Sequence, residues 1–196
     1  VRPRSELGIT GRAMAATLDQ FHERIVHRQH PDPLTGLSTR TQIIGELSRL
    51  ISSESGSAER AAFGCLAPDH FEEMIGSSGY AAGDELLKTI GTRLQEFLPD
   101  ALCIAYMGRS RFGFLAPAED SSRAHELAER VRSAMAMSPF TWDGKPYPVA
   151  TSLGVTLVSP CEGEADLLLS AADTACTAAR RAGGDRVILF RETDEA

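Results

Sequence analysis

Short apolar runs alternate with longer amphipathic segments along most of this chain, and this alternation limits the folds that the chain can form. The runs have the length of strands, and the segments between them repeat apolar residues every three or four positions, as helices do. Strands are predicted over 61–67, 102–106, 112–116, 147–158 and 186–190, and helices over 39–51, 69–75, 83–98, 121–137 and 165–182. The connection over 107–111, which contains Gly108, makes a hairpin of the second and third strands. This order predicts an α/β fold of the α+β kind, with a central, mostly antiparallel sheet flanked by helices.

The N-terminal segment, 1–31, is predicted to form a helical stalk. Its apolar residues recur at heptad spacing between Leu7 and Ile25, and Pro31 ends the helix because proline lacks a backbone donor. The segment is short for a coiled coil, which leaves two alternatives: a stalk that pairs in a homodimer, or a helix packed on its own domain. The rest of the chain then forms one domain over 32–191 and a tail over 192–196.

Composition excludes several classes of function. The net charge of -7 repels nucleic acid, and no apolar run has the roughly 18 residues of a membrane span, so direct membrane contact is not expected. The four cysteines contain no C-x-x-C pair, which predicts reduced core thiols in a cytoplasmic protein, and the five histidines lack metal spacing and are expected at the solvated surface. The chain starts at Val1 without a signal peptide, so we expect a fragment of a larger protein.

One stretch identifies a family. The residues Asp-Pro-Leu-Thr-Gly-Leu-Ser-Thr-Arg over 32–40 resemble the D-x-L-T-G-L-x-N-R opening of GGDEF domains, with Thr39 in place of the usual asparagine. Further matches follow at the expected places and extend the resemblance to Phe190; they are Gly79, Gly83, Asp84, the run 151–154, Ala172, Asp173, Gly183, Arg186 and Val187. The chain is therefore identified as a member of this family.

The resemblance implies a fold like the palm of polymerases and class III nucleotidyl cyclases. In an active member, two acidic positions hold two divalent metals that bind the phosphates of GTP, and two domains face each other to make cyclic di-GMP. By the same resemblance, the usual partners are a sensory domain and a phosphodiesterase-like EAL domain of the same protein.

The first family motif, D-x-D-x-F, has lost its leading acid. It reads Ala67-Pro68-Asp69-His70-Phe71, so a methyl group replaces the main metal ligand, while Asp69 matches the less critical second acid. The lysine that follows is replaced by Glu72, which repels phosphate, and the asparagine that reads guanine is replaced by Ile75. The second guanine contact, Asp84, is retained.

The signature hairpin is also degenerate. The G-G-[DE]-E-F motif reads Gly108-Arg109-Ser110-Arg111-Phe112, so both acids are absent and Arg111 places positive charge where metals would bind. Near the end of the chain, Arg180 replaces a family lysine and Thr177 replaces a tyrosine. The inhibitory R-x-x-D positions hold Pro99 and Leu102, so the usual product-binding site is not expected.

Several of these residues also have a structural interpretation. Gly108 and Phe112 serve turns and cores in many proteins, and Asp84 can cap the long helix. Arg109 and Arg111 form either an anion site or a solvated charged turn. Trp142 is expected at a surface hairpin turn.

These residues predict a noncatalytic GGDEF domain that acts as a regulatory and protein-interaction module, with neither a metal nor a cofactor. One alternative is a GTP sensor without turnover that regulates an attached EAL phosphodiesterase. In it Asp84 contacts guanine, the phosphates are contacted by Arg109, Arg111 or Arg180, and magnesium accompanies the nucleotide. The other is an active diguanylate cyclase, against which the missing acid pair argues.

Overall fold

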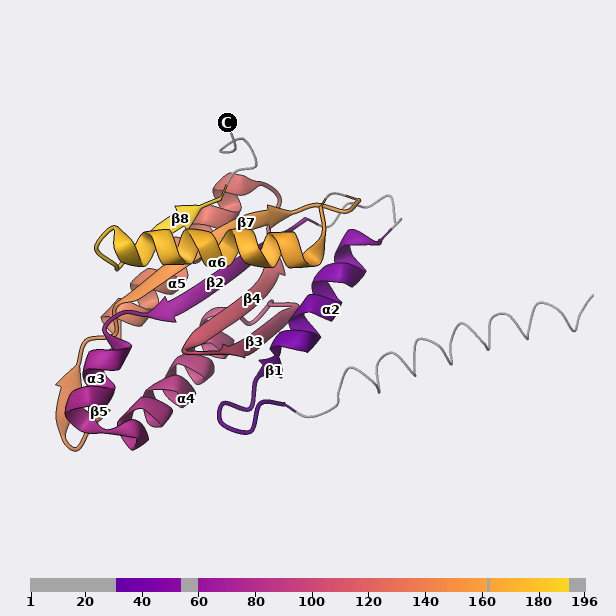
Figure 1. The fold of residues 1–196 in the computed structure, drawn as a ribbon. Helices are drawn as coiled ribbons and strands as arrows, with labels where there is room; N and C mark the ends of the chain where they lie inside the picture. The colour runs from indigo at the N-terminus through magenta and orange to yellow at the C-terminus, as the bar shows by residue number, and fades with distance from the viewer. Residues whose placement is uncertain (1–30, 54–59, 162, 191–196) are drawn as a thin grey trace, which may run out of the picture.

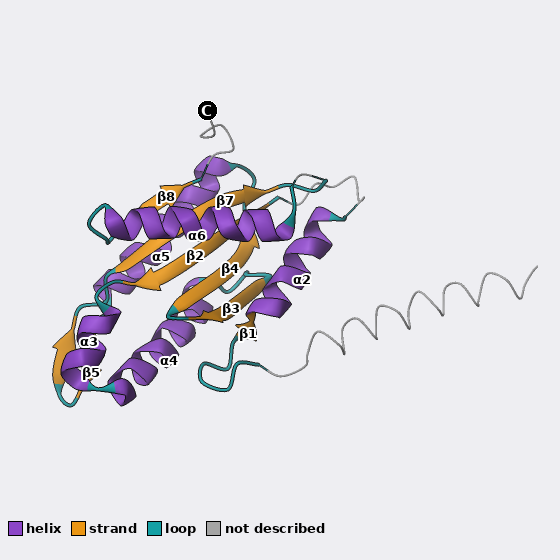
Figure 2. Cartoon of the chain, viewed as in Figure 1, coloured by secondary structure: helices purple, strands orange, loops and turns teal. Residues whose placement is uncertain are grey.

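A computed structural model describes residues 31–53, 60–161 and 163–190 (Figures 1 and 2). The strands are β1 Ser38–Thr39, β2 Ala61–Pro68, β3 Cys103–Gly108, β4 Arg111–Pro117, β5 Phe140–Trp142, β6 Lys145–Tyr147, β7 Thr151–Val158 and β8 Val187–Leu189. The helices are α2 Arg40–Ile51, α3 Phe71–Ser78, α4 Tyr80–Phe97, α5 Ser121–Met137 and α6 Ala165–Arg181. The predicted stalk and the predicted tail lie outside the described residues.

A central sheet with the strand order β1-β3-β4-β2-β7-β8 confirms the predicted fold class. β2 runs antiparallel to both of its neighbours, β4 and β7, whereas the edge strands β1 and β8 pair parallel with β3 and β7. Helices α2 and α6 cover one face of the sheet, and α4 and α5 cover the other (Figure 1). Both faces of the sheet are therefore buried, as its nearly continuous apolar strands require.

Alternate residues of β2 point to opposite sides because side chains in a strand have a period of two. Phe63, Cys65 and Ala67 pack with α2 and α6, whereas Ala62 and Leu66 pack with α4 and α5. All five residues are fully buried. The same alternation decides which residues of β2 meet α6 at the site described below.

The helix starts reflect local capping chemistry. Thr39 caps α2 with a capping box, in which its hydroxyl accepts from the Gln42 N–H and the Gln42 side chain accepts from the Thr39 N–H. The predicted start of the long helix at residue 83 is wrong, because α4 begins at Tyr80 after Gly79, whose φ is 83°. Asp84 therefore lies inside the helix and is not its cap.

Other boundaries also differ from the sequence prediction. The strand predicted over 147–158 starts later, as β7 at Thr151, because Tyr147 ends β6 of the separate β5–β6 hairpin and Pro148 follows it. The short helix predicted from Asp69 begins at Phe71 because His70 adopts a left-handed conformation, with φ 56°. The two-residue strand β1 was not predicted, as it is too short to show a period of two.

The surface hairpin around Trp142 is confirmed. Strands β5 and β6 pair across a turn in which Asp143 and Gly144 both have positive φ, and the half-buried Trp142 ring stacks on Phe140 with centroids 6.4 Å apart.

Two expectations about single residue types are corrected. Cys65, Cys103 and Cys176 are buried free thiols, but Cys161 is exposed because it lies in the turn after β7. His125 is half-buried on α5, with a buried Nδ1 that has no hydrogen-bond partner among the described residues, and so is not a solvated histidine. Within the described segments, no helix combines the length and apolar character needed to cross a membrane.

Candidate functional site

The β3–β4 hairpin carries the signature positions in a strained turn. Gly108, Arg109 and Ser110 all have left-handed backbone conformations, with φ values of 82°, 51° and 56°. Only glycine adopts this region without a steric penalty from Cβ, so the two other residues each store strain. The Ser110 hydroxyl donates to the Arg109 carbonyl at 2.6 Å, and the Ser110 N–H donates to the Tyr106 hydroxyl at 3.4 Å. Ser110 thus uses its polar groups within the hairpin.

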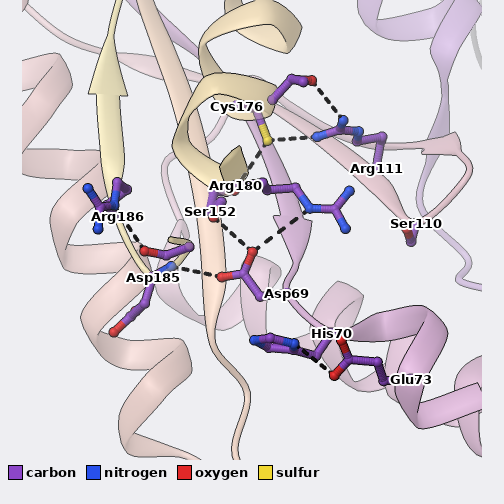
Figure 3. A network of polar contacts seen from close by, with 12 residues as sticks. Asp69, His70, Glu73, Ser110, Arg111, Ser152, Cys176, Arg180, Asp185 and Arg186 are labelled. Carbon is purple, nitrogen blue, oxygen red and sulfur yellow. Dashed lines mark hydrogen bonds and ion pairs between the residues drawn. The ribbon is translucent and has the colours of Figure 1, made fainter. Parts of the chain in front are cut away.

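Arg111 points away from the turn and into α6 (Figure 3). Its guanidinium donates to Cys176 Sγ at 2.8 Å and to Thr177 Oγ1 at 3.0 Å, and its Nε lies 3.4 Å from Asp173 Oδ1. The side chain is 18% exposed. The interpretation of Arg111 as part of a solvated turn is therefore wrong, because α6 engages its donors, whereas Arg109 remains exposed.

Asp69 lies at the end of β2 in a network that joins three parts of the fold (Figure 3). Its carboxylate accepts hydrogen bonds from Ser152 Oγ and from the Asp185 N–H, each at 2.8 Å. Arg180 Nε on α6 lies 3.9 Å from the same carboxylate. With its side chain only 6% exposed, Asp69 fastens β2 to β7 and to the turn before β8.

The positions that the family resemblance assigns to metal binding do not fit a divalent cation. Ala67 offers a buried methyl group, Ser110 offers a neutral hydroxyl already bonded to a backbone carbonyl, and Arg111 offers a cation. Magnesium prefers several oxygen ligands, including carboxylates. Over the described ranges, no three His, Cys, Asp or Glu side chains are placed to hold a metal ion.

The guanine-reading and phosphate-binding positions are changed as well. Ile75 packs against α4 at Gly83, where a Cβ would come within 2.9 Å of Ile75 Cγ1. Glu72 is exposed in the first turn of α3. Asp84 is exposed on α4, and Arg180 lies on α6 across the sheet, so the two retained candidate contacts belong to opposite layers of the fold.

A cluster of thiols and charges lies beside Arg111, and the sequence did not reveal it. Cys65 Sγ donates to Asp173 Oδ1 at 3.5 Å, and Cys176 Sγ donates to the Ser152 carbonyl at 3.3 Å. A hydrogen bond with Cys176 and burial raise the pKa of Cys65, whereas that hydrogen bond and the Arg111 charge lower the pKa of Cys176. The sequence signal that could have indicated this cluster is the period-two pattern of β2, because it places Cys65 on the face toward α6.

The positions of the family's inhibitory site line an open pocket of about 330 Å³ between β1 and the loop before β3. Pro99 and Leu102 are part of its wall, and none of the residues that line it is charged. A guanidinium and a carboxylate are both missing at the two motif positions, so this pocket lacks the groups that bind an anionic dinucleotide there.

Comparison with known proteins agrees with the fold and shows the family. The family model described as "Diguanylate cyclase, GGDEF domain" matches residues 29–186. The chain is 35% identical over 171 residues to diguanylate cyclase DgcP of Pseudomonas aeruginosa, across 85% of this chain and 25% of that protein. It is 29% identical over 190 residues to cyclic di-GMP phosphodiesterase NbdA of the same organism, across 93% of this chain and 24% of NbdA.

Among solved structures, the GGDEF domain of TpbB (YfiN) from Pseudomonas aeruginosa superposes with a TM-score of 0.75 and 28% identity. The match covers 83% of this chain and 95% of that one. The chain spans a quarter or less of the length of the two curated relatives named above, whereas it spans nearly all of this isolated domain.

Proposed function

Because the chain belongs to the GGDEF domain family of cyclic di-GMP signalling proteins, we propose that it is a noncatalytic member that acts as a regulatory and protein-interaction module. The observation that carries the proposal is the place of Arg111. Its guanidinium stands at the position of a family acid and is held by Cys176 and Thr177. A fixed cation there opposes divalent metal, and without metal the phosphates of GTP lose their main counter-charge.

The expected size of this loss is large. Losing one positioned acid or base costs roughly 100-fold to 10,000-fold in rate. Here Ala67, Ser110 and Arg111 stand at three positions where the family has acids, the metal-binding ones among them, and Asp69 is hydrogen-bonded to Ser152 and Asp185. The proposal therefore assigns no turnover to this chain.

The regulated partner that we propose is another domain of the same protein, either a sensory domain or an EAL phosphodiesterase. The match to NbdA supports a phosphodiesterase, because this chain aligns with 24% of a protein that is named for that activity. A domain of this kind transmits a change of conformation through its surface, as regulatory domains do when a ligand or partner shifts a two-state equilibrium.

A second candidate is a GTP sensor without turnover, and the exposed carboxylate of Asp84 favours it. This side chain makes no hydrogen bond or ion pair within the part of the chain that the structure describes, and it stands in the second turn of α4. Arg180 is 37% exposed on α6 and could meet a phosphate. Glu72 and Ile75 argue against this candidate, since one repels phosphate and the other cannot hydrogen-bond a base.

A calorimetric titration with GTP and magnesium tests the proposal, provided the recovered nucleotide is analysed for cyclic di-GMP. We expect neither heat of binding nor product. Binding without product, retained when magnesium is removed with EDTA, would establish the sensor instead. Cyclic di-GMP made by the unaltered chain would refute the noncatalytic assignment.

A restored variant provides the matched control. Ala67→Asp, Ser110→Asp and Arg111→Glu together return the acids that the family resemblance places at these positions. We expect magnesium-dependent GTP binding in this variant but not in the parent chain. Circular dichroism of both proteins checks that the triple variant is folded.

A further inference from the structure

Two buried thiols from distant parts of the chain meet beneath the signature hairpin. Cys65 lies in the central strand β2 and Cys176 in α6, and a side-chain hydrogen bond joins them. α6 approaches the sheet very closely here, because a Cβ on Gly154, the β7 partner of Cys65, would lie 2.3 Å from the Cys176 nitrogen. This close packing places the Cys176 backbone directly against the strand position beside Cys65.

The groups around the pair shift the pKa values of the two thiols in opposite directions. The hydrogen bond with Cys65 lowers the pKa of Cys176, and the charges of Arg111, which lies 2.8 Å from Cys176 Sγ, and of Arg180 lower it further, against burial and Asp173. The pKa of Cys65 is raised by its hydrogen bond with Cys176, by burial and by Asp173, against the opposing effect of Arg111. Cys176 is thus the more readily ionised of the two thiols, and Cys65 the less readily ionised.

The cluster is buried but lies close to the surface. Both cysteines have 0% exposure, whereas the side chains that contact them, Arg111 and Asp173, are 18% and 45% exposed. A low-pKa thiol beside a second thiol is the arrangement of redox-sensitive cysteine pairs.

We propose that Cys65 and Cys176 form a peroxide-sensitive dithiol that closes to an intramolecular disulfide between β2 and α6. The Cys176 thiolate attacks one oxygen of hydrogen peroxide, the O–O bond breaks, and the products are Cys176 sulfenic acid and hydroxide. The Cys65 sulfur then attacks the sulfenic sulfur, the S–O bond breaks, and water leaves with the Cys65 proton. Two thiols are oxidised, and with the hydroxide protonated from solvent one peroxide is reduced to two waters.

Closure of this disulfide alters the signature hairpin. It converts the thiol that accepts from Arg111 into a disulfide sulfur, so the guanidinium loses its shortest contact with α6. It also fixes α6 to the central strand of the sheet. Oxidation thereby changes the surface that the noncatalytic domain presents at the β3–β4 hairpin. This effect does not require GTP binding.

The test uses the full 196-residue chain carrying Cys161→Ser, which removes the exposed thiol. The protein is treated with hydrogen peroxide, unfolded, alkylated with a maleimide and digested without reductant for mass spectrometry. We expect a cross-linked peptide pair containing Cys65 and Cys176, lost on reduction. Cys103, buried with a raised pKa, is the internal control and remains alkylated in full. Alkylation of Cys65 and Cys176 as complete as in untreated protein would overturn the proposal.

Three variants test the assigned roles. Arg111→Gln should slow oxidation roughly 10-fold for each unit by which the pKa of Cys176 rises, whereas Arg111→Lys, which keeps the charge, should retain most of the rate. Cys65→Ser should leave a sulfenic acid at Cys176 that dimedone traps. An unchanged rate in Arg111→Gln, or a dimedone adduct at Cys65 in Cys176→Ser that forms as fast, would contradict the assignment of Cys176 as the attacked thiolate.

Discussion

Replacing Asp69 by alanine should destabilise the domain rather than abolish metal binding. The carboxylate accepts hydrogen bonds from Ser152 Oγ and the Asp185 N–H, both at 2.8 Å, and the side chain is 6% exposed. A hydrogen bond to a charged group contributes about 1.5–3 kcal/mol. We take the lower value for each hydrogen bond, because Asp185 is exposed and its N–H can bond to water instead. The free energy of unfolding should therefore fall by about 3 kcal/mol. In a domain of this size, that lowers Tm by roughly 6–12 °C.

Urea unfolding followed by circular dichroism measures this loss, with two further variants as references. Ser152→Ala removes one hydrogen bond and should cost about 1.5 kcal/mol, and the double variant should be less destabilised than the sum of the two. Glu73→Ala removes an acid whose side chain is 76% exposed and should change stability by less than about 1 kcal/mol. If magnesium raised the Tm of the parent chain and Asp69→Ala abolished that rise, Asp69 would be a metal ligand and this reasoning would fail.

Three further predictions concern backbone and capping, and denaturant unfolding measures each of them. Gly154→Ala should destabilise the domain by about 3 kcal/mol, because the added Cβ would lie 2.1 Å from the Ala172 carbonyl oxygen. Gly76→Ala should be neutral or stabilising, because no atom lies within 4 Å of its Cβ. Equal effects of the two substitutions would refute the packing argument. Arg109→Gly should stabilise the domain by roughly 0.5–1 kcal/mol, because glycine adopts the positive φ without strain, and Gly108→Ala should destabilise it by about 1–2 kcal/mol. Changes of the same sign in both variants would contradict the strain assigned to this turn. Thr39→Ala should cost about 1 kcal/mol through loss of the α2 cap, and an unchanged midpoint would mean that water replaces the cap.

Local patterns predicted most of the fold. The helix predicted over 121–137 has the bounds that α5 shows in the structure, where Asp120 caps its start and Pro139 follows its end. The start of α4 was misplaced, since Gly79 with positive φ begins the helix where the sequence shows neither a polar cap nor an apolar period. The strand β1 forms by pairing with β3, and no local sequence pattern predicts that pairing.

What the sequence determined by itself was the family, the fold class and the identity of the residues at the signature positions, because motif spacing and hydrophobic period are properties of the chain. Only the tertiary structure decided what those residues do. The sequence showed that Arg111 had replaced an acid, but not that it would be held by Cys176 and Thr177. It showed Asp69 as a retained acid, but not as an anchor between β2, β7 and β8. Such contacts join residues more than sixty positions apart, and only the pairing of β2 with β7 and the packing of α6 on the sheet bring them together.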